Sequence, residues 1–210
     1  MTSPRMLICG FGSFPEAPLN PAAAVIAALA REAWSPPGAE VDFLTLPVLW
    51  RGAAETILRQ VQQQPVKAVL VVGVAVEARA FRVEQTGRNQ AAAARPDQGG
   101  RVWGSGQILP GGPATLAATL PQAQIRQAIE ACGLPADLSD DAGDYLCNFT
   151  LYRLLHARVA EQVGFLHVPQ ARECAPGALH GLDDIQAAVC AAAETVAAAL
   201  IRPADEPRRA

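Results

Sequence analysis

The sequence predicts an α/β fold: a single three-layer α/β/α sandwich built around a mostly parallel, twisted sheet. Strand and helix signals alternate along most of the 210 residues, which is typical of this architecture. Residues 68–74 form a continuous apolar run, and such a run favours a strand covered on both faces, as in a parallel sheet. Half of all residues are apolar and 18% are charged, so a sizeable core is expected.

The first half of the chain predicts strands and helices in turn. Asn20 followed by Pro21 indicates a helix start, because asparagine caps free N–H groups and proline fits the first helical position. Apolar residues recur on one face of a second helix further along. We therefore expect strands over residues 6–11, 41–46 and 68–74, and helices over residues 20–33 and 51–63.

The second half contains a long glycine-rich segment, residues 87–113, with weak patterning. Loops of this length are usually functional or disordered, so this one is a candidate lid over a site. A final helix is expected to be capped by Asp183 or Asp184 and to end near residue 201. The other elements expected here are strands over residues 81–85 and 163–168 and helices over residues 121–132 and 147–163.

The domain organisation predicted is simple. The chain shows neither an internal repeat nor a linker, so residues 1–203 are expected to form one domain. Residues 204–210 are expected to be a polar C-terminal tail.

Composition argues against several classes of partner. The net charge is −3 and the sequence lacks a long basic run, so we expect no nucleic-acid partner. The first apolar run is too short for a signal peptide, and no stretch is expected to reach the length of a membrane helix, since Glu194 and Thr195 interrupt the alanine-rich end. A cytoplasmic protein without membrane contact is therefore expected. The five cysteines are irregularly spaced, which favours neither a disulfide framework nor a zinc site, and no metal or cofactor is implied.

Cys147 is the most informative residue of the chain. It lies where a short extended stretch turns into a predicted helix. Unpaired N–H groups and the positive end of the helix dipole favour a thiolate there, and the thiolate is the reactive form. His167 lies near the end of a predicted strand further on. A cysteine and a histidine on separate elements indicate a thiol hydrolase, although a buried core thiol and a structural histidine would give the same pattern.

A catalytic histidine needs an acidic partner that orients its ring. Glu84 ends a short strand with alternating apolar residues, and a charged group on a half-buried strand has to be paired. This places it slightly ahead of the other candidates, and the residues alone do not decide between them. Those other carboxylates are Glu77, Asp140, Asp141 and Asp144.

Five short motifs follow one another in an order that a known family shares. In this set of motifs, which spans roughly residues 7–169, the chain resembles the pyroglutamyl-peptidase I family, cysteine peptidases that remove an N-terminal pyroglutamyl residue. The motifs are Gly10-Phe11-Gly12-Ser13-Phe14 with Asn20-Pro21, Val72-Gly73 with Glu84, Gly111-Gly112-Pro113 with Leu120-Pro121, Ala142-Gly143-Asp144-Tyr145-Leu146-Cys147-Asn148, and Gly164-Phe165-Leu166-His167-Val168-Pro169.

The resemblance implies a role for each site residue. Cys147 would be the nucleophile, His167 the acid and base, and Glu84 the residue that orients the histidine. The substrate would be a small peptide with a blocked N-terminus, and a homo-oligomer would be plausible because family members often self-associate. The residues expected around the pyroglutamyl ring are Phe11, Phe14, Tyr145 and Leu146.

Departures from the family pattern lie in loops near the expected substrate. Gln85 follows Glu84 where the family has arginine, residues 95–98 read Arg-Pro-Asp-Gln, and Phe149 stands where histidine is common. They leave open a diverged thiol hydrolase acting on another cyclic or blocked amide. Glycine-rich residues 99–106 also leave open a non-catalytic nucleoside- or phosphate-binding relative, and a catalytically silent interaction protein is a further alternative.

Overall fold

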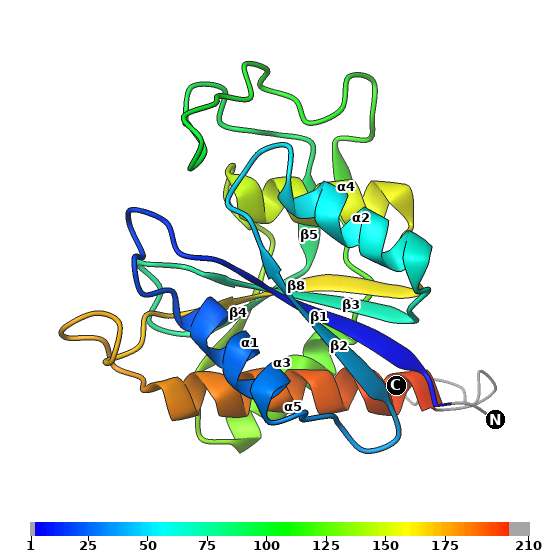
Figure 1. Ribbon diagram of the computed structural model, residues 1–210, viewed down its shortest axis with the longest axis vertical. Coiled ribbons are helices and arrows are strands. Elements are labelled where there is room, and N and C mark those ends of the chain that lie inside the picture. Colours follow the sequence, from blue (N-terminus) through cyan, green and yellow to red (C-terminus); the bar gives the residue numbers. More distant parts are fainter. Residues whose placement is uncertain (1–2, 202–210) are drawn as a thin grey trace.

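Six strands form the main sheet of the protein, whose computed structural model describes residues 3–201 (Figure 1). They are β1 (Arg5–Phe11), β2 (Glu40–Leu46), β3 (Ala68–Val74), β4 (Phe81–Glu84), β7 (Ala136–Ser139) and β8 (Gln162–Val168). Their order across the sheet is β2-β1-β3-β8-β4-β7. The strand expected at 68–74 is therefore a central strand, buried at every position as its apolar run predicted.

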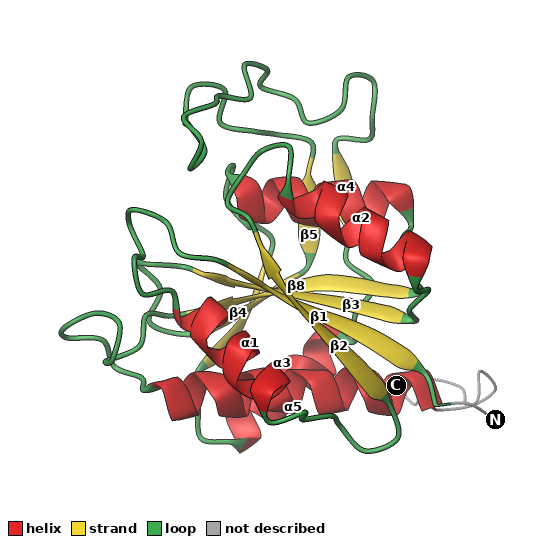
Figure 2. Ribbon diagram, in the orientation of Figure 1, coloured by secondary structure: helices red, strands yellow, loops and turns green. Residues whose placement is uncertain are grey.

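Helices cover both faces of this sheet (Figure 2). On one face lie α2 (Ala53–Gln63) and α4 (Leu146–Ala157). On the other lie α1 (Pro21–Arg31), α3 (Gln122–Ala131) and α5 (Leu182–Ile201). The predicted three-layer α/β/α sandwich is confirmed.

Alternate residues of the strands feed two separate cores. In β1, Met6 and Ile8 face α1 and α5, whereas Leu7 and Cys9 face the α2 and α4 side. The same alternation holds in β8, where Phe165 belongs to the α4 side and Leu166 to the other. The face on which any strand residue lies therefore follows from its parity along the strand.

The sheet is mostly parallel, but its β4–β7 edge runs the other way. β1, β2, β3 and β8 pair in parallel, whereas β4 pairs antiparallel with β8 and parallel with β7. The sequence reading did not predict β7. Its carboxyl-terminal residue, Ser139, is buried next to Glu84 in register, while Asp137 and Leu138 are exposed.

A second, two-stranded sheet holds the base of the long loop. β5 (Thr86–Arg88) pairs antiparallel with β6 (Thr115–Ala117). The chain between them projects beyond α4 at the top of Figure 1. The predicted loop at 87–113 is thus present, and the short strands that bracket it were not predicted.

Two helix ends differ from their predictions. α4 stops at Ala157 rather than near 163, because Arg158 adopts a left-handed backbone conformation with φ 50°. α5 begins at Leu182, so neither Asp183 nor Asp184 is its cap residue. Instead, the Asp184 carboxylate accepts a hydrogen bond at 2.8 Å from the N–H of Gly181, which stabilises the helix start from within its first turn.

The expectation that no segment reaches membrane-helix length was wrong. α5 has 20 residues and is apolar enough, by length and composition, to cross a membrane. Its apolar residues have a different explanation, because Ile185, Val189 and Val196 are buried in the core beside α1 and α3. The predicted tail at 204–210 lies outside the described residues.

The contact between β1 and α1 should tolerate no side chain at Gly10. A Cβ there would lie 2.7 Å from Ile26 Cγ1 and 3.0 Å from the carbonyl oxygen of Ala22. Gly10→Ala should therefore lower the free energy of unfolding by about 1–3 kcal/mol, measured by urea denaturation. Gly106→Ala is the control, since a Cβ at Gly106 meets nothing within 4 Å. Equal stability of the two variants would contradict this packing.

Candidate active site

Cys147 is the second residue of α4, as the sequence predicted. The intrahelical hydrogen bonds of α4 begin with the N–H of Phe149, which donates to the carbonyl of Tyr145 at 2.9 Å. Tyr145 precedes the helix and provides no side-chain cap. The Cys147 sulfur therefore lies in the first turn, where N–H groups free of intrahelical bonds favour negative charge.

Gly73 makes room for this sulfur in the sheet. A Cβ at Gly73 would lie 3.2 Å from Cys147 Sγ and 2.7 Å from the ring of Phe165. Gly73 is also the residue of β3 that pairs in register with His167 of β8. The sulfur thus rests against the sheet directly beside the strand position of the histidine.

His167 and Glu84 face the same side of the sheet as Cys147. His167 follows Phe165 by two residues, so both side chains point to the α4 side of the sheet. Phe81 and Val83 face the opposite core, so Glu84, the next residue of β4, points to the α4 side as well. Glu84 pairs with Phe165 across the antiparallel strands, so it is a diagonal neighbour of His167. Its Oε1 lies 2.7 Å from His167 Nδ1.

The surroundings of His167 favour the imidazolium. Burial lowers the pKa of the ring, but the negative charge of a Cys147 thiolate and the hydrogen-bonded Glu84 carboxylate outweigh this effect. The pKa rises from an ordinary 6.5 to about 9. A proton on His167 is therefore stabilised from both sides.

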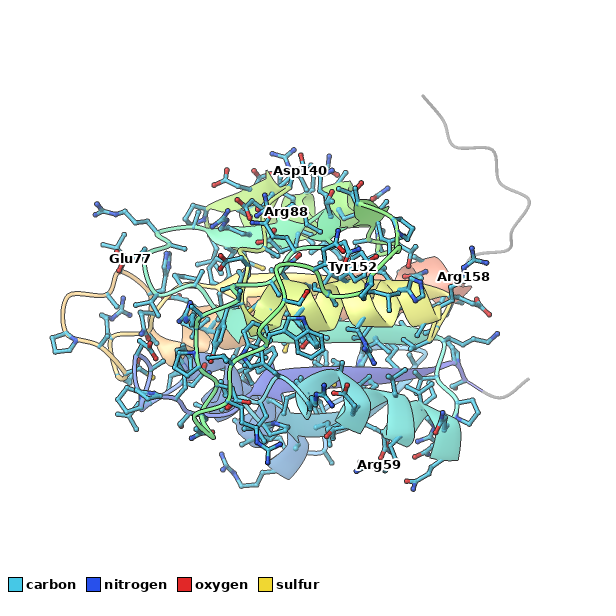
Figure 3. All side chains as sticks on the ribbon, turned by 90° about the horizontal axis from the view of Figure 1, so that it is seen from above. Arg59, Glu77, Arg88, Asp140, Tyr152 and Arg158 are labelled. Carbon is cyan, nitrogen blue, oxygen red and sulfur yellow. The ribbon has the colours of Figure 1, made fainter. Side chains whose placement is uncertain are left out.

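Glu84 is fully buried and contacts His167, whereas the four other candidate carboxylates are exposed and make no hydrogen bond to this ring. Asp140 accepts a hydrogen bond from Thr86, and Asp141 pairs with Arg88. Figure 3 labels Asp140 and also Arg88, which belongs to β5 together with Thr86. Asp144 and Glu77 are exposed and line a cavity, with Glu77 in the connection after β3. The structure thus separates one carboxylate from candidates that the residues alone left open.

A cavity of about 560 Å³ opens beside Cys147 and His167. This volume is typical of small-molecule sites. Its lining includes all four residues expected around the substrate ring. Phe11 and Leu146 are buried, and Phe14 and Tyr145 are half-buried.

Charged residues gather at the exposed rim of the cavity. Arg95 comes from the long loop, and its guanidinium stacks 3.9 Å from the centre of the Tyr145 ring. It also lies 3.7 Å from Glu16, which belongs to the loop after β1. Arg95 therefore connects two loops across the rim.

Two residues of the site were missed as site residues by the sequence reading. Gly73 was noted only as part of a motif, and Arg82 was passed over, although both line the cavity. Period-two alternation placed Arg82 on the face of Glu84, but its nearness to His167 required knowledge of strand pairing. Within residues 3–201, no three His, Cys, Asp or Glu side chains are grouped as a metal site would need.

The model of the pyroglutamyl peptidase family matches residues 4–200. The chain belongs to this family. It is a hydrolase of the cysteine-peptidase class, as the motifs predicted. A pyrrolidone-carboxylate peptidase of Deinococcus radiodurans is 35% identical over 171 residues, which cover 79% of this chain and 78% of the relative. One of Chromobacterium violaceum is 34% identical over 207 residues, covering 97% and 96%.

Solved structures of the family share the fold. A mutant pyrrolidone carboxyl peptidase of Pyrococcus furiosus superimposes with a TM-score of 0.86 at 27% identity. The match covers 94% of this chain and all of the other. The whole sandwich, rather than a part of it, is therefore common to both proteins.

The proton on His167 should depend on the Cys147 thiolate. In a ¹H–¹³C NMR titration, the ring should titrate near the pKa of about 9. Cys147→Ser should move the midpoint to lower pH, because the negative charge that stabilises the imidazolium is removed. The exposed His156 provides an internal reference. An unchanged midpoint for His167 in the serine variant would show that the sulfur does not stabilise the ring.

Cys147 should be the cysteine that iodoacetamide modifies first near neutral pH, as measured by peptide mass spectrometry. Cys9 is fully buried, and burial raises the pKa of Cys190 to about 11, so both should react slowly. Cys132 is the informative control because it is exposed without facing the cavity. Labelling of Cys132 at the rate of Cys147 would argue against an activated thiolate.

Proposed function

We propose that this chain removes the N-terminal pyroglutamyl residue of small peptides through Cys147, His167 and Glu84. The observation that carries the proposal is the contact of 2.7 Å between His167 and Glu84 beside the Cys147 sulfur. The N–H at Nδ1 of His167 donates a hydrogen bond to Glu84, which turns the other ring nitrogen toward the sulfur.

The first half of the reaction transfers the acyl group to sulfur. His167 takes the thiol proton of Cys147, and the thiolate attacks the carbonyl carbon of the pyroglutamyl amide. The carbon–nitrogen bond breaks, and His167 gives its proton to the leaving amine. The products of this half are a thioester on Cys147 and a peptide shortened by one residue.

Water completes the cycle. His167, now neutral, removes a proton from a water molecule as the oxygen attacks the thioester carbon. The carbon–sulfur bond breaks, free pyroglutamate leaves, and Cys147 recovers its proton or remains a thiolate paired with the imidazolium. Glu84 keeps the ring in the same orientation in both halves.

The start of α4 suits the negative oxygen that develops at the carbonyl. The N–H of Cys147 itself lies in the first helical turn, which makes it a natural donor to that oxygen. The helix dipole adds to this effect at the same place. The element that activates the thiolate would thus also stabilise the intermediate.

The lining of the cavity accounts for the choice of a blocked N-terminus. A pyroglutamyl ring is a neutral lactam, whereas an ordinary N-terminus carries an ammonium group. The deep wall is formed by apolar groups such as Phe11, Val74 and Leu146, and burying an ammonium there would be costly. The charged residues Glu16, Glu77 and Asp144 lie at the exposed rim, beyond the expected place of the ring.

The second candidate is a thiol hydrolase that prefers another cyclic or blocked amide. It is motivated by Arg95, which lies in the altered segment and lines the cavity. The link from Arg95 to Tyr145 and Glu16 also supports the long loop as a lid. Self-association and a cytoplasmic location stay predictions.

The proposal is tested with a fluorogenic pyroglutamyl amide under reducing conditions. Cys147→Ala should abolish turnover, and His167→Ala should lower kcat/KM by roughly 10²- to 10⁴-fold, since proton transfer is lost. Glu84→Gln should also impair turnover, because the amide cannot stabilise the imidazolium. Asp140→Asn is the matched control, as this carboxylate binds Thr86 rather than His167.

Prolyl amide is the matched control substrate, because it has the same ring size but a charged nitrogen. If Cys147→Ala turned over the pyroglutamyl amide at the wild-type rate, the assignment of Cys147 as the nucleophile would be wrong. A reactive Cys147 combined with no cleavage of the pyroglutamyl amide would favour the second candidate.

A further inference from the structure

β4 carries a second charged residue on the face of Glu84. Arg82 precedes Glu84 by two residues, so both side chains point to the α4 side of the sheet. Across the antiparallel pair, Arg82 lies directly opposite His167. Its side chain lines the cavity and is 38% exposed. A permanent positive charge therefore lies beside both members of the hydrogen-bonded pair.

The contacts of Arg82 aim its guanidinium at the carboxylate. Nε lies 3.9 Å from Glu84 Oε1, the same oxygen that contacts His167 Nδ1. Nη2 donates to the hydroxyl of Ser139 at 3.0 Å and to the carbonyl of Asp141 at 3.3 Å. β7 and the residues after it thus hold the far end of the arginine while the near end faces Glu84.

Glu84 needs such a partner. The residue is completely buried, and its Oε2 has no hydrogen-bond partner in the described chain. A buried carboxylate is costly unless a positive charge compensates it. His167 compensates it only while the ring is protonated, and in the proposed cycle the ring gives its proton to the leaving amine. At that moment the arginine remains charged.

We propose that Arg82 is a positioning residue that keeps Glu84 ionised, and thereby holds His167 in its productive tautomer, throughout the reaction. This inference rests on the function proposed above. If Glu84 became protonated, it would lose the negative charge that stabilises the imidazolium, and its O–H could donate to Nδ1 and favour the wrong tautomer of His167. The arginine acts through the carboxylate and not on the substrate.

The other charged groups around the site cannot replace it. Arg88, the nearby cation, is paired with Asp141. The remaining charged groups facing the cavity or Arg82 are acidic, apart from Arg95, which pairs with Glu16 at the rim. These acidic groups are Asp137 opposite Arg82 on β7, and Glu77, Asp141 and Asp144 on the cavity lining.

Removing the positive charge of Arg82 should shift the pH profile of the reaction in a predictable direction. A positive charge favours the deprotonated form of every group near it, whether thiolate, carboxylate or imidazole. Without Arg82, each of these groups should hold its proton to higher pH. The acidic limb of the pH profile should therefore move upward whichever group controls it. A purely structural role would lower the rate without moving this limb.

The test measures two pH profiles for Arg82→Gln and Arg82→Lys. One is kcat/KM for the pyroglutamyl amide, and the other is the rate of Cys147 alkylation by iodoacetamide, which needs no turnover. In Arg82→Gln both acidic limbs should move up by roughly half to one pH unit, a modest shift because the arginine is partly exposed. On that limb kcat/KM should fall about three- to tenfold, and Arg82→Lys should restore most of the loss.

Two controls and one alternative variant keep the outcome clear. Arg126→Gln removes a positive charge that pairs with Glu130 on α3, and it should leave both profiles in place. If Arg82→Gln does not fold, Ser139→Ala should shift the limbs in the same direction by less, since it frees the guanidinium from its acceptor.

Superimposable profiles for wild type and the measurable variant would overturn the inference, as would a lysine variant that behaves like glutamine. Failure of the proposed function has a different signature: no cleavage by the wild type, with the alkylation profiles still available to test Arg82.

Discussion

The hydrogen bond between His167 and Glu84 is the constraint on which the rest of the site depends. It joins a central strand to an antiparallel neighbour, so its geometry is set by backbone pairing rather than by a flexible loop. Because Glu84 is fully buried, the pair forms only where the sheet is intact on both faces. The histidine is thereby aligned before any substrate arrives, which is how a preorganised acid and base lowers a barrier.

The Cys147 sulfur approaches this pair from a separate layer of the fold. α4 is anchored by aromatic contacts: Trp50 packs edge-on against Tyr145 and Phe149, which flank the sulfur in sequence, and Trp103 packs against Phe149. The start of α4 places the Cys147 sulfur against Gly73, the residue of β3 that pairs in register with His167. Helix packing and a missing side chain in the sheet together place the sulfur beside the strand position of His167.

The floor of the site is built from the sheet and α4, and its rim is built from loops. Sheet and helix supply Cys147, His167 and Glu84, the three residues proposed to carry the reaction, whereas Glu16 and Arg95 come from loops. A rigid floor would preserve the chemistry while the loops of the rim change. This agrees with a family match over residues 4–200 in a chain whose 85–98 segment departs from the family pattern. Arg82 belongs to the floor of the site, because it lies on β4 and donates a hydrogen bond to Ser139 of β7.

Local patterns were sufficient for the sandwich, for most helices and strands and for the helix-start position of Cys147, and the family resemblance indicated the cavity lining by Phe11 and Leu146. These features depend on apolar periodicity, capping and short motifs, which neighbouring residues express directly. The reversed direction of β4, the space at Gly73 and the place of Arg82 emerged only from the folded chain, whereas the choice of Glu84 over Asp140 came from the family resemblance and was left open by the residues alone. The first three depend on which strands lie side by side, and pairing between distant segments is decided by the packing of the whole core rather than by adjacent residues.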